Sequence, residues 1–447
     1  MTEIVIGVDV GSSSVKAAAY DHGGRVVGNG RIPTPSVVGP FGVDFPVPAV
    51  VEAARTAARE AARGRAIAGV GLTSMGEVGA VLTAGGAWSG TAFPAWHDDR
   101  GADVASRLTE QSPLVNGRSG GHVRATSSLA KLAWLAGTGH DLDGCFLGLC
   151  GLLAERWTGA RWQEASLAAT SGAYDPVTGE WLTDLWSAAG LDHVRLPEVF
   201  PAGAGVRARG RTAEQDGLGG ALIVIAGHDH PVAAVGTGSS AGDVVDSLGT
   251  GEPVLAAWAA PPPAAEVSDL VERGFTVETW PSTGDPLLIW EGLRPGLAMD
   301  AVIGASGRSR DELESAVWDA GVRPFSRDEA RALERGDTTP LGRRDLSPES
   351  ALSTWRAAWT DLLHAYARDA AVGEQEIRRA TAASGPLVLT GGGLRSSLWL
   401  AAKRAATSSP IRVAALADSG ARGAAAITGA TLEWWPDAAS MPLEDNE

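Results

Sequence analysis

An acidic side chain and a serine-rich turn stand close together near the start of the chain. Residues 4–27 read IVIGVDVGSSSVKAAAYDHGGRVV, in which Asp9 stands near the end of an apolar run. The turn that follows consists of Gly11, Ser12, Ser13 and Ser14. Glycine permits a sharp bend where a side chain would obstruct a ligand, and serine hydroxyl and backbone N–H groups donate to phosphate oxygens. This spacing predicts a phosphate-binding turn, with an ordinary serine-rich hairpin turn as the alternative.

Two charged side chains beside this turn fit the same chemistry. Asp9 is placed to hold Mg²⁺ through the water ligands of the ion, because Mg²⁺ keeps most of its hydration shell and takes only one or two carboxylates. The chain has only three lysines, Lys16, Lys131 and Lys403. Lys16 is therefore either a phosphate contact or a solvated lysine on a strand.

The elements that must position these groups are the strands of a hairpin. The apolar run over Ile4–Val10 is typical of a strand that is buried on both faces. After the serine turn and a second strand, Gly23 and Gly24 lead into a further strand at Arg25–Gly28. A P-loop or dinucleotide-binding glycine turn leads into a helix instead. The order of strand, turn and strand therefore separates this site from those motifs.

Length, composition and charge restrict the class of protein. With 447 residues, 44% of them hydrophobic, the chain can form two or three domains with substantial cores. A formal net charge of -16 argues against nucleic acid or an anionic membrane as the main partner. The N-terminus runs directly into a strand and no apolar segment is long enough to span a bilayer, so we expect a cytoplasmic enzyme. Cys145 and Cys150, the only cysteines, are expected to be buried reduced thiols.

The order of the predicted elements indicates a mixed α/β organisation. The elements are helices over 46–63, 353–371, 396–406 and 420–432 and strands over 67–73, 221–225, 243–247, 253–258, 386–390 and 411–414. A further helix is expected to begin at Pro231, a residue favoured in the first helical turn. Residues 127–202 are predicted to be helices and loops, and residues 301–348 helices joined by exposed loops.

The second half of the chain repeats the arrangement of the first. An apolar strand that ends at Ser247 enters the turn Gly249-Thr250-Gly251 and leaves through another strand. A later strand enters a run of three glycines, residues 391–393, before a helix. Two α/β halves, each with a glycine turn suited to phosphate, predict a duplicated fold around a cleft.

Five motifs in a fixed order resemble the FGGY carbohydrate kinases. They are Gly7-x-Asp9-x-Gly11-Ser-Ser-Ser-x-Lys16, Trp96-His97-Asp98-Asp99-Arg100, Gly227-His228-Asp229-His230, Asp246-Ser247-Leu248-Gly249-Thr250 and Gly391-Gly392-Gly393-Leu394-Arg395-Ser396. The resemblance extends from Ile4 to about Gly429 and is weakest between Ala260 and Gly385. The family includes kinases of xylulose, glycerol, gluconate, ribulose and related polyols, and it belongs to the superfamily of sugar kinases, chaperone ATPases and actin.

The resemblance implies a fold class and a division of the chain. The implied fold is α/β, a duplicated ribonuclease-H-like (actin-like ATPase) fold with two domains around a central cleft. The N-terminal domain, residues 1–226, would bind sugar and carry the first phosphate hairpin. The C-terminal domain, residues 227–434, would bind ATP, and residues 435–447 would form a tail.

The resemblance also implies that Asp229 is the catalytic base. A sugar hydroxyl is a weak nucleophile, and a carboxylate within hydrogen-bond reach can accept its proton as the bond to the γ-phosphorus forms. Asp9 and Asp229 are the implied ligands of Mg²⁺, which would offset the charge on the phosphates. The alternative for Asp229 is an aspartate that caps the helix expected at Pro231.

The sugar-binding residues implied by the resemblance lie in three segments. They are Met75, Gly76, Glu77, Trp96, Asp98, Arg100 and His230. Asp98 and Arg100 match the Trp-x-Asp-x-Arg segment of the family, in which the aspartate accepts hydroxyl hydrogens and the arginine donates, and the alternative is a surface ion pair. Trp96 either stacks on the substrate or packs. Xylulose kinases usually carry Met-His-Gly at residues 75–77, so the change to Met-Gly-Glu alters the pocket where substrate is selected.

The nucleotide-binding residues implied by the resemblance come from both halves of the chain. They are Gly11, Ser12, Ser13, Ser14, Lys16, Gly249, Thr250, Gly392, Gly393 and Ser396. The three glycines at 391–393 resemble an adenosine-binding turn, where a purine approaches closely and Ser396 can hydrogen-bond to it. The alternative is a plain connection from strand to helix.

The sequence as a whole predicts a kinase that uses ATP and Mg²⁺ to phosphorylate a hydroxyl of a small sugar, ketose or polyol. The expected partner is that small molecule, with no nucleic acid, no membrane and a possible homodimer. One alternative is a non-catalytic regulator that binds sugar or nucleotide, and another is an ATPase that drives a partner protein. Retention of Asp9 and Asp229 disfavours the first, and the polyol-type residues Trp96, Asp98 and Arg100 disfavour the second.

Overall fold

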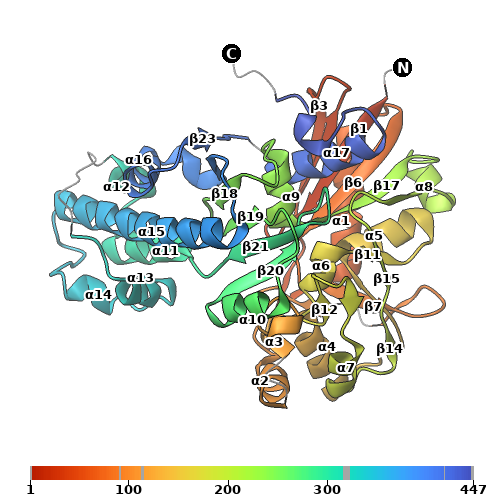
Figure 1. Cartoon of the computed structure of the whole chain (residues 1–447), viewed down its shortest axis with the longest axis horizontal. Coiled ribbons are helices and arrows are strands. Elements are labelled where there is room, and N and C mark those ends of the chain that lie inside the picture. The colour runs from red at the N-terminus through yellow and green to blue at the C-terminus, as the bar shows by residue number, and fades with distance from the viewer. Residues whose placement is uncertain (1–2, 90–91, 112–114, 316–322, 417, 444–447) are drawn as a thin grey trace. The chain divides into compact units, whose positions relative to one another are not determined.

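The computed structural model describes residues 3–89, 92–111, 115–315, 323–416 and 418–443 (Figure 1). The chain divides into two units by the density of its internal contacts. Unit 1 comprises residues 1–240, 260–287 and 418–447, and unit 2 comprises residues 241–259 and 288–417. Each unit mixes helices with strands, as the sequence predicted.

The main sheet of unit 1 has the strand order β16-β17-β6-β1-β2-β3. Its strands are β1 (Ile4–Val10), β2 (Ser14–Tyr20), β3 (Val26–Pro33), β6 (Ile67–Ser74), β16 (Gly205–Arg207) and β17 (Leu222–His228). The strands β1, β6 and β17 are parallel, with Val10 and His228 both in register with Ser74. The carboxyl ends of the three strands therefore meet at one edge of the sheet. The strands β1, β2 and β3 form the predicted antiparallel hairpin and its extension.

Two helices cover opposite faces of this sheet. Alanines of α1 (Val47–Ala62) share a core with Ile4, Ile6, Val8 and Val10. The other face meets α17 (Ser419–Thr431), which lies against β1 and β6 in Figure 1. A Cβ on Gly7 would lie 1.7 Å from the carbonyl oxygen of Ala421, so only glycine lets this helix approach so closely.

Smaller elements complete unit 1. Its other helices are α2 (Ala102–Gln111), α3 (Val115–Arg118), α4 (Ser128–Gly137), α5 (Leu149–Thr158), α6 (Ala165–Ala169), α7 (Thr183–Ala188), α8 (Arg211–Gln215), α9 (Asp229–Gly236) and α10 (Ala264–Glu272). Its other strands are β4 (Val37–Gly39), β5 (Gly42–Phe45), β7 (Gly79–Leu82), β8 (Trp88–Ser89), β9 (Phe93–Pro94), β10 (Gly144–Gly148), β11 (Trp162–Glu164), β12 (Tyr174–Asp175), β13 (Glu180–Trp181), β14 (Val194–Arg195), β15 (Glu198–Phe200) and β20 (Phe275–Thr279). The strands β14, β10, β7 and β8 form a second sheet.

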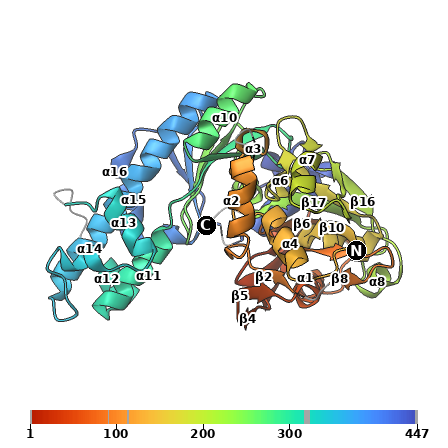
Figure 2. The same cartoon turned by 90° about the horizontal axis from the view of Figure 1, so that it is seen from below.

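The strands of unit 2 are consecutive in one sheet, in the order β21-β19-β18-β22-β23. The strands are β18 (Val244–Ser247), β19 (Val254–Ala257), β21 (Pro286–Trp290), β22 (Leu387–Thr390) and β23 (Ile411–Val413). The helices are α11 (Pro295–Ser306), α12 (Arg310–Glu314), α13 (Arg327–Glu334), α14 (Thr339–Gly342), α15 (Leu352–Thr381) and α16 (Ser397–Ala406). The long helix α15 contacts α11, α13 and α16, as Figure 2 shows, and a Cβ on its Gly373 would lie 1.7 Å from a ring carbon of Trp290.

Several sequence predictions need correction at this level. Residues 127–202 were expected to hold only helices and loops, but β10 and short strands lie there, because a five-residue apolar run does not show which periodicity it follows. Helix α9 begins at Asp229 rather than at Pro231, and α15 continues to Thr381. The two cysteines are buried and unpaired, as predicted. Among the residues placed in the structure, no helix combines the length and apolarity needed to cross a bilayer.

Candidate active site

Three aspartates and a lysine gather at the carboxyl edge of the parallel strands of unit 1. Asp9 lies on β1, and Asp229 follows β17 directly as the first residue of α9. Asp418 precedes α17, and its Oδ1 lies 3.2 Å from Nζ of Lys16. Burial, followed by the charge of Asp229, raises the pKa of Asp9 to about 7, and Lys16 only partly opposes this. The excess of negative charge at this edge favours binding of a cation.

Two buried carboxylate oxygens at this edge have room for a further partner. Oδ1 of Asp9 is buried and accepts no hydrogen bond from any residue that the structure describes, and the buried Oδ1 of Asp229 has only the ring nitrogen Nε2 of His228, at 3.3 Å, as an oppositely charged neighbour. A buried acceptor without a donor is costly, and hydrated Mg²⁺ would satisfy both oxygens while using the one or two carboxylates that this ion prefers. In the described parts of the chain, no three His, Cys, Asp or Glu side chains are close enough to hold a metal by themselves. Asp9 and Asp229 therefore fit a water-rich magnesium site.

Asp229 has a charged neighbour in His228, the residue before it in the chain. Nε2 of His228 lies 3.3 Å from Oδ1 of Asp229, and Nδ1 of the same ring lies 3.0 Å from Oε2 of Glu278 on β20. Burial lowers the pKa of His228, but the charges of Glu278 and Asp229 outweigh it and hold this pKa well above its ordinary value. An imidazolium thus links the two carboxylates and fixes the direction in which Asp229 points.

The backbone of His228 is anchored as well. Its N–H donates to Oγ of Ser166 at 2.8 Å, and that hydroxyl donates to Oε2 of Glu164 at 2.6 Å. Burial raises the pKa of Glu164 to about 7. A Cβ on Gly227 would lie 2.6 Å from the Ser166 hydroxyl, so this glycine gives the anchor its space. The sequence did not predict that Glu164 and Ser166 hold His228, because the two residues stand in a polar segment without a recognisable motif.

The segment after β6 holds one of the predicted sugar-binding residues in a strained backbone. Met75 is buried, and a Cβ on Gly76 would lie 2.6 Å from Cγ2 of Thr170. Glu77 has a φ of 57°, in the left-handed region, and its N–H donates to Oγ1 of Thr170 at 3.1 Å. Such a backbone costs on the order of 1–3 kcal/mol outside glycine, and where it is not a helix C-cap it clusters at active sites and ligand-binding segments. The strain supports a binding role for Glu77.

Asp98 and Arg100 form a buried pair rather than a surface one. Nε and Nη2 of Arg100 donate to the two carboxylate oxygens of Asp98 at 2.7 and 2.9 Å. Nη2 also donates to the carbonyl of Val43 at 3.1 Å and to Asp44, and the guanidinium lies over the ring of Trp134. Burial opposes ionisation of Asp98, but the hydrogen bonds from Arg100 outweigh it and lower the pKa of Asp98. Arg100 therefore orients Asp98 as an ionised acceptor.

Two predicted sugar contacts have exposed rings. The side chain of Trp96 is 37% exposed and meets His97 edge to face. His230 is exposed, with its ring centre 5.6 Å from that of His228. The charge of Glu77 also acts on His228. The sugar-binding segments and the predicted base thus belong to one neighbourhood of unit 1.

In unit 2 the two glycine turns pack on each other. The N–H of Gly393 donates to the carbonyl of Leu248 at 2.9 Å, next to Gly249 and Thr250. A Cβ on Gly391 would lie 2.5 Å from that same carbonyl oxygen, and one on Gly393 would lie 2.6 Å from the ring of Trp399. These glycines are thus required by packing, whereas Gly392 is exposed and free for a close ligand.

Ser396 has structural partners inside unit 2. It is buried at the N-terminus of α16, where its hydroxyl accepts from the N–H of Trp399 at 3.0 Å and donates to Glu314 at 2.6 Å. The hydroxyl proton is therefore committed to Glu314. The predicted contact of Ser396 with a purine has to use its remaining lone pair.

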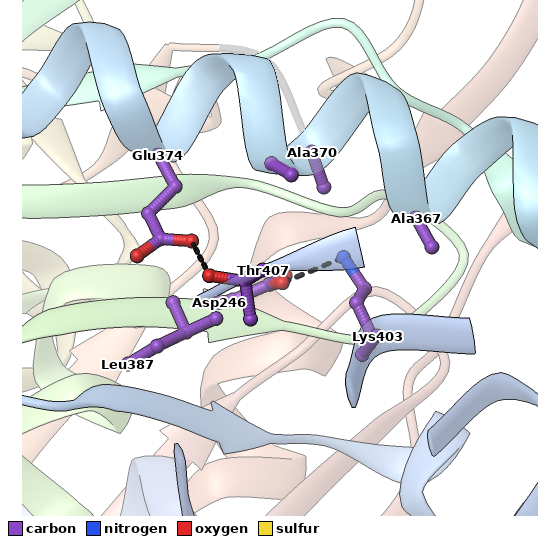
Figure 3. A pocket seen from close by; sticks show the side chains of 8 residues that line it. Asp246, Ala367, Ala370, Glu374, Leu387, Lys403 and Thr407 are labelled. Carbon is purple, nitrogen blue, oxygen red and sulfur yellow. Dashed lines mark hydrogen bonds and ion pairs between the residues drawn. The ribbon is translucent and has the colours of Figure 1, made fainter. Parts of the chain in front are cut away.

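A buried lysine fixes the first turn of unit 2. Nζ of Lys403 on α16 donates to Oδ2 of Asp246 at 2.6 Å and also to Oε1 of Glu252. Asp246 precedes and Glu252 follows the turn that contains Gly249 and Thr250, so the ammonium ties both ends of that turn to one helix. Figure 3 shows Asp246 and Lys403 lining a cavity of about 10 Å³, the size of one water. No motif in the sequence indicated that Lys403, Asp246 and Glu252 contact one another.

Comparisons with known proteins bear on the family and the fold of the chain. The model for the FGGY family of carbohydrate kinases, N-terminal domain, matches residues 4–236. A xylulose kinase of Streptomyces rubiginosus is 28% identical, covering 99% of this chain and 92% of its own, and an L-fuculokinase of Haemophilus influenzae is 23% identical, covering 74% of this chain and 72% of its own. The solved structure of a xyloylose kinase from Brucella ovis has a TM-score of 0.82 at 21% identity, covering 96% of this chain and 91% of its own. The predicted duplicated fold is confirmed.

Proposed function

The chain belongs to the FGGY family of carbohydrate kinases, and from this premise we propose that Asp229 is the general base that lets ATP phosphorylate a hydroxyl of a small sugar. The activity itself, carbohydrate phosphorylation at the expense of ATP, follows from the family and from relatives named as kinases. The names of the relatives, a xylulose kinase and an L-fuculokinase, support a ketose or a related polyol as the substrate class.

The observation that supports this role best is the state of the Asp229 carboxylate. Its buried Oδ1 lies 3.3 Å from Nε2 of His228, and the pairing of that ring with Glu278 fixes the orientation of the carboxylate. A base needs a carboxylate that is held in place and still has an unused lone pair within reach of the substrate hydroxyl. Asp229 accepts the hydroxyl proton as the bond to the γ-phosphorus forms, and His228 keeps the carboxylate from rotating away.

The nucleotide is proposed to bind through the serine-rich turn after β1, the turn after β18 and the aspartates at the carboxyl edge of the sheet of unit 1. The turn of Gly11, Ser12, Ser13 and Ser14 and the turn of Gly249 and Thr250 would donate N–H groups to phosphate oxygens. Asp9 and Asp229 would hold Mg²⁺ through water, and the bound ion would offset the charge of the phosphates. Lys16 pairs with Asp418 and is 27% exposed, so it keeps donors for a phosphate. Gly392 and Gly393 would lie beside the adenosine.

The sugar is proposed to bind in unit 1. Asp98, oriented by Arg100, would accept from sugar hydroxyls together with Glu77, and Trp96 and His230 would present their exposed rings. Met75 and Gly76 would shape the wall of the pocket. In this division residues 1–226 bind sugar and residues 227–434 bind ATP, and the cytoplasmic location and the homodimer stay predictions.

The test is sugar-dependent release of ADP from ATP and Mg²⁺ over a panel of pentoses, ketoses, polyols and sugar acids. Asp229→Asn is expected to lower kcat by a factor of about 10²–10⁴, the usual contribution of a general base, with the KM for ATP changed by less than threefold. Asp99→Asn, a change of an exposed aspartate, is the matched control and should leave turnover intact. Near-normal turnover of Asp229→Asn would remove Asp229 from the mechanism. ATP binding without turnover on any sugar would favour the non-catalytic regulator.

A further inference from the structure

Lys131 is a buried lysine that the mechanism above does not use. It lies on α4 and its relative exposure is 0%. Lysine is almost never fully buried without a partner, because removing its charge from water is costly. The cost is visible in the pKa of Lys131, which burial lowers to about 8. The free-energy cost of burying the ammonium is offset only where its N–H groups find acceptors, so the partners of Lys131 show what it does.

The ammonium contacts main-chain oxygens of two separate segments. Nζ donates to the carbonyl of Ala95 at 2.7 Å and to the carbonyls of Glu77 and Trp96 at 3.3 Å each. An ammonium has three N–H donors, so these acceptors use all of them. One segment carries residues 75–77 and the other carries residues 96–100, which together hold most of the proposed sugar contacts. Lys131 thus joins the two segments directly.

Glu77 is held on both sides of its strained backbone. Its N–H donates to Oγ1 of Thr170 and its carbonyl accepts from Nζ of Lys131. A left-handed backbone in a residue other than glycine persists only where the surroundings over-determine it. Thr170, which follows α6, and Lys131 on α4 supply two such constraints from two different elements. The conformation of Glu77 therefore depends on both side chains.

Three charged groups act on Lys131 besides its burial. The carboxylates of Glu77 and Asp98 raise its pKa, whereas the guanidinium of Arg100 lowers it. Each of these groups belongs to the proposed sugar site. The hydrogen bonds of the ammonium go to neutral oxygens, so they fix the positions of backbone atoms without neutralising either carboxylate.

We propose that Lys131 is a positioning residue for the sugar, which holds the segments carrying Glu77, Trp96 and Asp98 in the geometry that binds substrate hydroxyls. This inference rests on the proposed function, since that function assigns the sugar to these segments. A lysine that only supported the fold would affect sugar and ATP alike when removed. A lysine that positions the sugar site affects the sugar selectively.

The test compares Lys131→Met with the unchanged full-length protein. D-Xylulose, or the panel sugar with the fastest turnover, is the probe. Losing the charged hydrogen bonds is expected to raise the KM for the sugar about tenfold, with the KM for ATP changed by less than twofold. In the unchanged protein the KM for the sugar should also rise about tenfold between pH 7 and pH 9.5, as the ammonium loses its proton, and this rise should be absent in Lys131→Met. Thr170→Val, which keeps the lysine, should retain the alkaline rise.

The possible outcomes separate this inference from the proposed function. No sugar-dependent turnover by the unchanged protein would contradict the proposed function, whatever the variants do. With turnover established, an unaltered KM for the sugar in Lys131→Met, or equal rises in both KM values, would overturn the positioning role. If Lys131→Met does not fold, the pH profile of the unchanged protein decides: a rise confined to the KM for the sugar supports the role, and a flat profile overturns it.

Discussion

Two of the three lysines of this chain are buried, and their surroundings are opposite. Lys131, in unit 1, donates to three neutral carbonyls, whereas Lys403, in unit 2, donates to the acidic side chains of Asp246 and Glu252. Burial lowers the pKa of both lysines. For Lys131 that effect dominates and the pKa falls to about 8, whereas at Lys403 the carboxylate charges outweigh it and raise the pKa.

The difference shows two ways in which a buried ammonium can fix a loop. Acidic side chains compensate the charge of Lys403, so Lys403, Asp246 and Glu252, here called the Lys403 cluster, depend on one another for stability. Carbonyl oxygens compensate it less, so Lys131 holds backbone geometry at a cost and remains close to losing its proton near physiological pH. We therefore expect removal of Lys403 to act mainly on stability, and removal of Lys131 mainly on sugar binding.

The largest effect should come from Lys403→Met. It leaves the Asp246 carboxylate buried without its cation and removes the donor to Glu252, and breaking a buried ion pair in this way costs about 3–5 kcal/mol. Lys131→Met leaves only neutral oxygens without a donor and should cost about 1–2 kcal/mol. Urea unfolding of each variant gives the free energies.

Lys16→Met is the control for this pair of variants. Its side chain is 27% exposed and that of its partner Asp418 is 35% exposed, so its loss should change the free energy of unfolding by about 1 kcal/mol or less. Equal destabilisation by Lys131→Met and Lys403→Met would break the comparison, because the two kinds of surroundings would then be equivalent in energy.

A smaller effect, confined to sugar binding, is expected from Asp98→Asn. The amide keeps the shape of the side chain but loses the charge that Arg100 orients, so the KM for the sugar should rise by about 10–100-fold, the value of a hydrogen bond to a charged group. The KM for ATP should change by less than threefold. Initial rates with each substrate varied in turn measure both constants.

Asp246→Asn in unit 2 is the matched control for Asp98→Asn in unit 1. It removes a carboxylate of the same type that pairs with a lysine, and it should lower stability without a selective rise in the KM for the sugar. If Asp98→Asn and Asp246→Asn raised the two KM values in the same ratio, the assignment of sugar binding to unit 1 would be wrong.

Elements with a long and regular pattern could be predicted from the sequence. The helix expected over 420–432 is α17, Ser419–Thr431, and the strand expected over 4–10 is β1. Short buried strands such as β10, Gly144–Gly148, could not be predicted, because five apolar residues fit a strand and a buried helix equally well. The last part of α15, beyond residue 371, is weakly patterned and contacts the rest of unit 2 through single residues such as Gly373.

The residues of the candidate site that stand in a sequence motif could be predicted. The residues on distant segments that hold them in place could not. Asp9, Asp98 and Asp229 stand in recognisable motifs, and their roles stay predictions. The residues that hold them in place, such as Glu278 and Lys131, are single residues on other elements. Nothing in the local sequence of β20 indicates that Glu278 contacts His228, since only the tertiary structure brings β20 and β17 together.

The smallest effect concerns which carboxylate of the Lys403 cluster carries the charge. Burial, only partly opposed by Lys403, raises the pKa of Glu252 from 4.5 to about 8, so Glu252 is expected to keep its proton at neutral pH while Asp246 balances the ammonium. Glu252→Gln replaces a protonated carboxyl with a neutral group of the same shape. It should therefore change the free energy of unfolding far less than Lys403→Met does, by about 1 kcal/mol at pH 5.

The pH dependence of this variant gives the sharper test. Below pH 4.5 Glu252 is protonated whether or not the chain is folded, so its ionisation has no effect on stability. Between pH 4.5 and about 8 the folded chain keeps the proton that the unfolded chain releases, so stability falls as pH rises, and above that range the loss is constant. Glu252→Gln lacks this loss, so its free energy of unfolding relative to that of the unchanged protein should rise by on the order of 1–3 kcal/mol from pH 5 to pH 8. If the free energy of unfolding of Glu252→Gln instead fell relative to the unchanged protein over that range, Glu252 would be ionised beside Lys403. Both acidic side chains, rather than Asp246 alone, would then distinguish the surroundings of Lys403 from those of Lys131.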